Sequence, residues 1–155
     1  MDYHVSKTNF GETPEFEYPK ALFLEEMGEE GLVKLFSDFY DLIIDSDIGN
    51  WNVSNIDDMF RLFQGATNFN QDISNWVVSE VTIMNAMFEN AERFNQNISG
   101  WNVSKATGMN NTFKNADDFN QPIGIWNVSS VTSMINTFDS ADSFNQDISD
   151  WEVSK

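Results

Sequence analysis

The chain has 155 residues, which favours a single domain, and 41% of them are apolar, including 14 Phe and 5 Trp. This composition can bury a core and is not that of a disordered chain. Acidic residues outnumber basic ones by 25 to 8, which gives a formal charge of −17. The charge argues against nucleic acid and anionic membrane surfaces as partners, because both are bound through Lys and Arg.

The chain has no Cys and a single His, at position 4. These counts exclude disulfides, thiolate metal sites and Cys nucleophiles, and they argue against a Ser/His/Asp triad. We therefore expect no cofactor and no metal. No stretch reaches the length of a membrane span, and the first residues lack the pattern of a targeting signal. We expect a soluble protein without membrane insertion, cytoplasmic by default.

Residues 1–47 differ from the rest of the chain and carry 12 acidic and 3 basic side chains. Residues 1–19 contain two Pro and a Gly, which is typical of an irregular arm. Apolar residues then follow helical spacing at Leu32, Leu35, Phe36, Phe39, Tyr40 and Ile43. Because the open end of a stack of repeats needs an atypical cap, we assign residues 20–45 to a helical cap.

From residue 48 onward the chain repeats itself every 25 residues. The clearest column is formed by Trp51, Trp76, Trp101, Trp126 and Trp151. Columns of Ile, Val, Met, Phe and Ala keep the same spacing. Four full units span 48–72, 73–97, 98–122 and 123–147, and a partial fifth spans 148–155. We expect these units to form one repeat domain over residues 48–155.

Each unit combines two periodicities. Trp51 and Val53 are two residues apart, which predicts a short strand with both side chains on one face. Met59, Phe63 and Ala66 follow at spacings of four and three, which predicts a helix of two to three turns. Neither piece can bury its apolar side alone. The predicted fold is therefore an α/β solenoid of short parallel strands and helices behind the N-terminal helical cap.

The consensus Phe-Asn-Gln-Asp-Ile-Ser-x-Trp-x-Val-Ser-x-Val-Thr-x-Met-x-x-Met-Phe-x-x-Ala resembles the 25-residue repeat of BspA-type leucine-rich-repeat surface proteins. That repeat is abundant in mycoplasma surface lipoproteins and is also known as a domain of unknown function. The resemblance covers residues 48–155. It implies a leucine-rich-repeat-like solenoid, a binding or adhesion role and a cell-surface location. The offsets of Ile48, Trp51 and Val53 also match the general pattern L-x-x-L-x-L.

Four polar or aromatic columns have structural interpretations. The Trp column is expected in the core, with each indole N–H satisfied by a neighbouring backbone or Asn group. The column Asn70, Asn95, Asn120 and Asn145, in which each Asn precedes a Gln, predicts a buried ladder that satisfies turn backbone groups from unit to unit. The Ser54 column suits a turn or a helix N-cap. The column Asp72, Asn97, Pro122 and Asp147 lacks the regular carboxylates of a calcium site and predicts a turn.

The residues between the core positions of successive strands are the candidate partner surface. Two such residues per unit form this surface: Asn50 and Asn52, Asn75 and Val77, Gly100 and Asn102, Ile125 and Asn127, and Asp150 and Glu152. The candidate binding residues among them, which we call the strip, are Asn52, Val77, Asn102, Asn127 and Glu152. In a solenoid these positions form a continuous surface, here mostly amide and small, that can hydrogen-bond a polypeptide or a glycan. The strip lacks an aromatic anchor. It is a weak candidate binding site.

The partial fifth unit is the candidate surface for self-association. An unpaired edge strand with apolar neighbours is a template for association. We therefore expect a homodimer or other homo-oligomer that forms through residues 144–155, and its apolar contacts are Phe144, Ile148, Trp151 and Val153.

Two classes of function follow from these observations. The first is a non-enzymatic protein-interaction or adhesion-type module. The alternative is a hydrolase that acts on a glycan through acidic residues, which would need a concave pocket and a carboxylate with a raised pKa. The doublets Asp57-Asp58 and Asp117-Asp118 are expected to be solvated, and no acidic pair marks a catalytic site.

Overall fold

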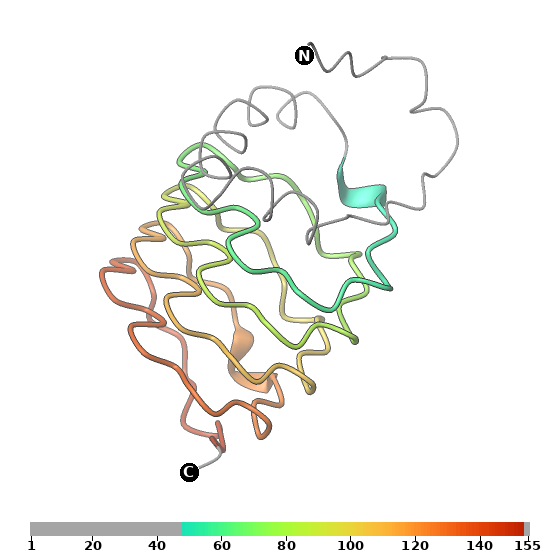
Figure 1. Cartoon of the computed structure of the whole chain (residues 1–155). Helices are drawn as coiled ribbons and strands as arrows, with labels where there is room; N and C mark the ends of the chain where they lie inside the picture. Colours follow the sequence, from blue (N-terminus) through green and yellow to red (C-terminus); the bar gives the residue numbers. More distant parts are fainter. Residues whose placement is uncertain (1–47, 154–155) are drawn as a thin grey trace, which may run out of the picture.

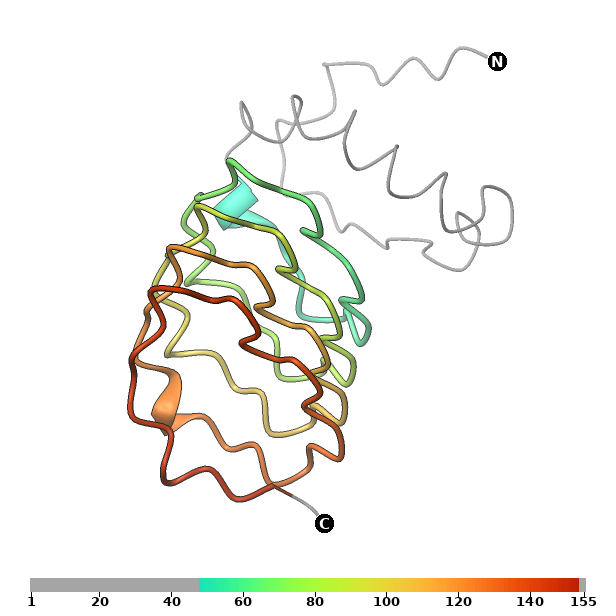
Figure 2. The ribbon, with the colours of Figure 1, turned by 90° about the vertical axis from the view of Figure 1, so that its left-hand side faces the viewer.

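The structure, a computed structural model, describes residues 48–153. In this part the chain winds into successive coils, each of which lies against the next (Figure 1). One coil corresponds to one 25-residue unit, because backbone groups bond across about that distance in sequence. The N–H of Met59 donates to the carbonyl of Ile83 (2.9 Å), and that of Met84 to Gly108 (3.0 Å). A second view shows the coils following one another along a single axis (Figure 2).

Regular secondary structure is almost absent from residues 48–153. This part contains two short 3-10 helices, η2 (Ile48–Asn50) and η3 (Ile123–Ile125). It also contains three isolated parallel bridges, which join Asp58, Ile83, Gly108 and Ser133 in series. None of its helices is long and apolar enough to cross a membrane.

The predicted α/β fold class is therefore wrong. The described coils contain neither the strands expected at the Trp and Val columns nor the helices expected after them, so the leucine-rich-repeat solenoid is not supported. The predicted helical cap, residues 20–45, lies outside the described residues. What the structure retains from the sequence pattern is the stacking of matched side chains, described below.

The predicted helix does not form, because each full coil contains two residues with a left-handed backbone conformation. They occupy two columns four residues apart, and their φ values are between +53° and +77°: Arg61, Ala86, Asn111 and Asn136, and Gly65, Asn90, Asn115 and Ser140. A residue in this conformation cannot continue a right-handed helix. It instead takes the third place of a turn, as in type II turns. Leu62 N–H closes one such turn on Met59 O, and Ala66 N–H closes another on Phe63 O, both at 3.2 Å.

Turn bonds and inter-coil bonds alternate along this segment. The N–H groups of Met59, Arg61, Phe63 and Gly65 each donate to a carbonyl of the next coil, at 2.8 to 3.0 Å. The N–H groups between them, beginning with Leu62, close turns inside their own coil. Buried backbone groups are thus satisfied without a helix or a sheet.

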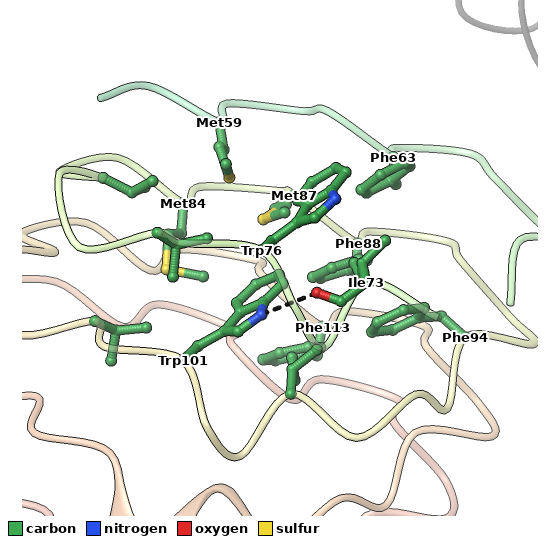
Figure 3. Close-up of a cluster of buried hydrophobic side chains, with 14 of the residues drawn as sticks. Met59, Phe63, Ile73, Trp76, Met84, Met87, Phe88, Phe94, Trp101 and Phe113 are labelled. Atoms are coloured by element: carbon green, nitrogen blue, oxygen red, sulfur yellow. Dashed lines mark hydrogen bonds between the residues drawn. The ribbon is translucent and has the colours of Figure 1, made fainter. Parts of the chain in front are cut away.

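The core consists of aromatic and aliphatic columns along the axis (Figure 3). In one column Phe63, Phe88 and Phe113 stack with ring centroids 5.4 and 5.5 Å apart, and their planes are nearly parallel. A second Phe column packs beside it, with Phe88 and Phe94 4.0 Å apart. Full burial of a Phe side chain contributes about 1.5–3 kcal/mol, so each fully buried ring in these columns stabilises the stack by about this amount.

The Trp column adds both stacking and hydrogen bonds. Trp76 and Trp101 stack at 6.4 Å with an angle of 2° between their planes. The indole N–H of Trp101 donates to the backbone carbonyl of Ile73 in the preceding coil, at 3.2 Å (Figure 3). Equivalent bonds are made by Trp76, Trp126 and Trp151. The prediction of a core Trp whose N–H meets a neighbouring backbone group is confirmed for Trp76, Trp101 and Trp126, whereas Trp51 and Trp151 are partly buried.

Candidate functional site

The strip predicted from the sequence lies on the outside of the coils. Each of its five members is exposed, and each directly follows a residue of the Trp column: Asn52, Val77, Asn102, Asn127 and Glu152. The Trp rings behind them stack in register, so the strip residues form one column along the axis. The indole hydrogen bonds of Trp76, Trp101, Trp126 and Trp151 hold the backbone that precedes four of the five strip residues.

Local turns hold the asparagines of the strip. The side-chain oxygen of Asn127 accepts hydrogen bonds from the N–H of Ser129 (3.1 Å) and from its hydroxyl (2.7 Å). Asn102 accepts from the N–H of Ser104 in the same way, at 3.2 Å. These are Asx turns, in which the side chain mimics a backbone turn. The turn expected at the Ser54 column is confirmed, with the preceding Asn as its acceptor.

In this arrangement the turns use only the side-chain oxygen of each asparagine. Within residues 48–153, the Nδ2 groups of Asn102 and Asn127 donate no hydrogen bond, while their oxygens are occupied by the turns. The strip therefore presents N–H donors whose orientation the turns restrict. The motif Asn-x-Ser carries this signal in the sequence, although the sequence analysis assigned the turn to Ser alone.

Exposed apolar side chains accompany the amides. Ile125 is 78% exposed and Val77 is 55% exposed. Ile125 precedes Asn127 by two residues, whereas Gly100 takes the matching place beside Asn102 and leaves open space there. The sequence analysis placed Ile125 on this surface but did not choose it among the candidate binding residues. Its exposure adds an apolar contact beside the amide donors.

The Asn–Gln columns have a structural role instead. Asn70 Oδ1 accepts hydrogen bonds from Asn95 N–H and from the Gln96 side chain, both at 2.9 Å. The pattern continues from Asn95 to Asn120 and from Asn120 to Asn145. The predicted ladder is confirmed, except that these residues are half-buried or exposed rather than buried.

Two carboxyl groups of the described coils have shifted pKa values. Hydrogen bonds from the hydroxyl and N–H of Ser74 lower the pKa of Asp72, and those from Ser149 lower the pKa of Asp147. Both carboxyl groups are exposed, whereas a general acid needs a raised pKa. In residues 48–153 no three His, Cys, Asp or Glu side chains are grouped to hold a metal ion.

The coil that carries the predicted self-association residues is less buried than the coils before it. Phe144, Ile148 and Trp151 are only partly buried, and Val153 is 51% exposed. The corresponding side chains one coil earlier are at most 4% exposed. These residues thus lie together at one end of the described stack.

The family model described as "Mycoplasma protein of unknown function, DUF285" matches residues 31–151. The chain belongs to the DUF285 family. DUF285 is the BspA-like repeat domain, so the resemblance drawn from the repeat holds at this level, whereas the leucine-rich-repeat designation is not supported. Neither the curated proteins nor the solved structures contain a match to the chain.

Proposed function

We propose that this DUF285 chain is a non-enzymatic interaction module of the adhesion type, which binds an extended polypeptide along the strip. The observation that supports the proposal is the column of exposed asparagine amides, whose oxygens are occupied by Asx turns and whose N–H groups face no protein acceptor in residues 48–153. Carbonyl oxygens of an extended chain are suitable acceptors for such donors.

The stacked coils favour binding because they hold these donors in place. The Trp rings that precede the strip residues repeat every 6.4 to 6.5 Å along the axis, which sets the spacing of the strip from coil to coil. A rigid site loses little conformational entropy when a ligand binds. Val77 in the strip and Ile125 beside it supply exposed apolar contacts. A glycan presents hydroxyl acceptors instead of carbonyls and is the alternative ligand.

The test is binding of the labelled chain to arrays of defined peptides and defined glycans. The double substitution Asn102→Lys and Asn127→Lys replaces two amides by longer, charged side chains and should abolish the peptide signal. Ser130→Lys is the matched control, because it adds a Lys at an exposed position where the preceding coil already has Lys105. An unchanged signal in the double variant overturns the proposed site, and a signal on glycans alone overturns the proposed ligand.

The alternative function, a glycan hydrolase that uses acidic residues, has less support. The described carboxylates with shifted pKa values are Asp72 and Asp147, and both pKa values are lowered. General acid catalysis at neutral pH requires the opposite shift. Release of reducing sugars from polysaccharides incubated with the full chain would favour the hydrolase over the interaction module.

A further inference from the structure

Gly100 interrupts a column of side chains that runs beside the strip. The column consists of the residues two positions before each strip residue: Asn50, Asn75, Gly100, Ile125 and Asp150. A Cβ atom added at Gly100 would meet no heavy atom within 4 Å, so the space outside this residue is open. We call this space the gap. A ligand side chain can lie there directly against the backbone, because Gly has no side chain to exclude it.

Exposed apolar side chains lie in the coils on either side of the gap. Ile125 occupies the same column in the following coil and is 78% exposed. Val77 belongs to the strip in the preceding coil and is 55% exposed. A ligand that covers apolar surface removes it from water, which favours binding. The gap is therefore suited to an apolar side chain.

The repeat of the coils matches the repeat of an extended peptide. The Trp rings that precede the strip residues lie 6.4 Å apart in one pair of coils and 6.5 Å apart in another. An extended chain rises about 3.2–3.4 Å per residue, so two residues span about 6.4–6.8 Å. A peptide that runs along the axis thus advances by two residues per coil. Carbonyl groups two residues apart point the same way, so two of them can face the amides of Asn102 and Asn127 in register.

The same register decides which ligand side chains face the coils. Side chains alternate along an extended chain, so every second one points toward the protein, one for each coil. The side chain opposite Gly100 has room to be large. Those two positions away meet the coils of Asn75 and Ile125, where an exposed side chain already occupies the corresponding place. The coils thus distinguish one position of the peptide from its neighbours.

Charge restricts the ligand further. Residues 48–153 carry 13 acidic and 4 basic side chains. Two of the basic side chains already pair with acidic ones, since Lys105 lies 2.7 Å from Glu80 and Lys114 lies 3.7 Å from Asp139. An acidic peptide would be repelled by the remaining negative charge. The surface therefore favours a neutral or basic ligand.

We propose that the strip binds an extended, neutral or basic peptide that places one large aliphatic or aromatic side chain in the gap, against Ile125 and Val77. This inference rests on the proposed function and adds to it the register and the residue preference of the ligand. Small side chains occupy the peptide positions two residues before and after the large one. Gly100 determines specificity, whereas the amides of Asn102 and Asn127 bind the main chain of any extended peptide.

A positional-scanning array of peptides without Asp or Glu tests this proposal. Peptides of about nine residues suffice, because in extended form they span about four coils. The labelled full chain should select Leu, Ile, Met or Phe at one position and Gly, Ala or Ser two positions away. Gly100→Leu fills the gap, and it should fold because φ at Gly100 is not positive and its Cβ position is open. This variant should bind peptides with the large residue about tenfold more weakly and should bind peptides with Ala there as the unmodified chain does.

Two further variants test the position and the register. Ser130→Leu adds the same side chain at an exposed position away from the gap, and should leave the preference unchanged. Ile125→Ala opens the next place in the column, so a large residue should become acceptable two positions from the first.

The outcomes separate this inference from the proposed function. If the unmodified chain binds peptides without preference for a large apolar residue, or if Gly100→Leu leaves that preference unchanged, the inference fails and the proposed function stands. A second large residue accepted at another spacing in Ile125→Ala would also overturn the register. Absence of peptide binding by the unmodified chain would overturn both.

Discussion

Phe113 offers the sharpest test of the aromatic columns. Its ring lies between those of Phe88 and Phe138, with centroids 5.5 Å away on either side, and 4.1 Å from the ring of Phe119. The side chain is 1% exposed. Phe113→Ala therefore removes contacts to the coil above, the coil below and its own coil. Phe138→Ala makes the same chemical change in a coil that has no further Phe ring stacked on its other side within residues 48–153.

The two substitutions should lower the free energy of unfolding by clearly different amounts. Replacing a buried Phe by Ala usually costs about 3–5 kcal/mol, and each aromatic pair adds about 0.5–1.5 kcal/mol beyond the buried area. We therefore expect Phe113→Ala to lower the free energy of unfolding by about 4–5 kcal/mol. Phe138 is partly exposed and retains only its neighbours on one side and in its own coil, so about 2 kcal/mol is expected there.

Urea unfolding followed by the fluorescence of the five Trp side chains measures both costs. The protein should be dilute, so that the unfolding midpoint does not depend on protein concentration. The midpoint should move much further for Phe113→Ala than for Phe138→Ala, with unchanged denaturant slopes if the stack unfolds as one unit. Equal destabilisation by the two variants would refute the reasoning, because it would mean that both rings are equally covered.

Two further predictions, on glycine substitutions and on the stability of the protein at acid pH, can be tested by urea unfolding. Gly65 has φ +77° and Gly100 does not have a positive φ, while both have open space at the Cβ position. Gly65→Ala should thus cost about 1 kcal/mol, and Gly100→Ala should stabilise by about 0.4–1 kcal/mol; destabilisation of equal size would contradict the assigned turns. The Ser74 hydrogen bonds lower the pKa of Asp72, so ionised Asp72 stabilises the folded state. This stabilisation is complete above the ordinary pKa of Asp and is lost as the pH falls through the lowered pKa. Asp72→Asn should reduce the loss of stability as the pH falls below about 4, and an unchanged dependence of stability on acid pH would exclude this contribution.

The sequence predicted the stacking of side chains well because matched residues recur at a constant interval. Columns of identical large side chains can all be buried only if the coils superimpose, and Trp76, Trp101 and Trp126 are indeed buried. The same reasoning predicted the indole hydrogen bonds and the Asn–Gln ladder. In both cases the argument depends on burial and on satisfying polar groups, and neither requirement depends on the local backbone conformation.

The local conformation was mispredicted because two structures share the same spacing. Apolar residues separated by three or four positions lie on one face of a helix, but consecutive turns also direct Met59, Phe63 and Ala66 inward. The column of Gly65, Asn90 and Asn115 carried the missing signal, since Gly and Asn adopt positive φ more readily than other residues.

Ala86 shows why local preference alone could not decide the fold. An Ala with φ +55° costs about 1–2 kcal/mol relative to a right-handed conformation. The stack offsets this cost, because the Ala86 N–H donates to Asn110 O at 2.8 Å and the side chain is only 4% exposed. Packing between coils therefore selects the turn conformation, so a prediction made from one unit in isolation misses it.

The division between constant and variable columns also bears on where function lies. The Trp column holds the same residue in every unit, because a smaller side chain would open the core and leave an Ile carbonyl without its donor. The next residue is Asn, Val or Glu in different units, because its exposed side chain carries no comparable packing constraint. Substitution there can alter a ligand contact without disturbing the stack. Ligand preference among chains with this architecture should therefore follow the strip, while their stability should follow the buried columns.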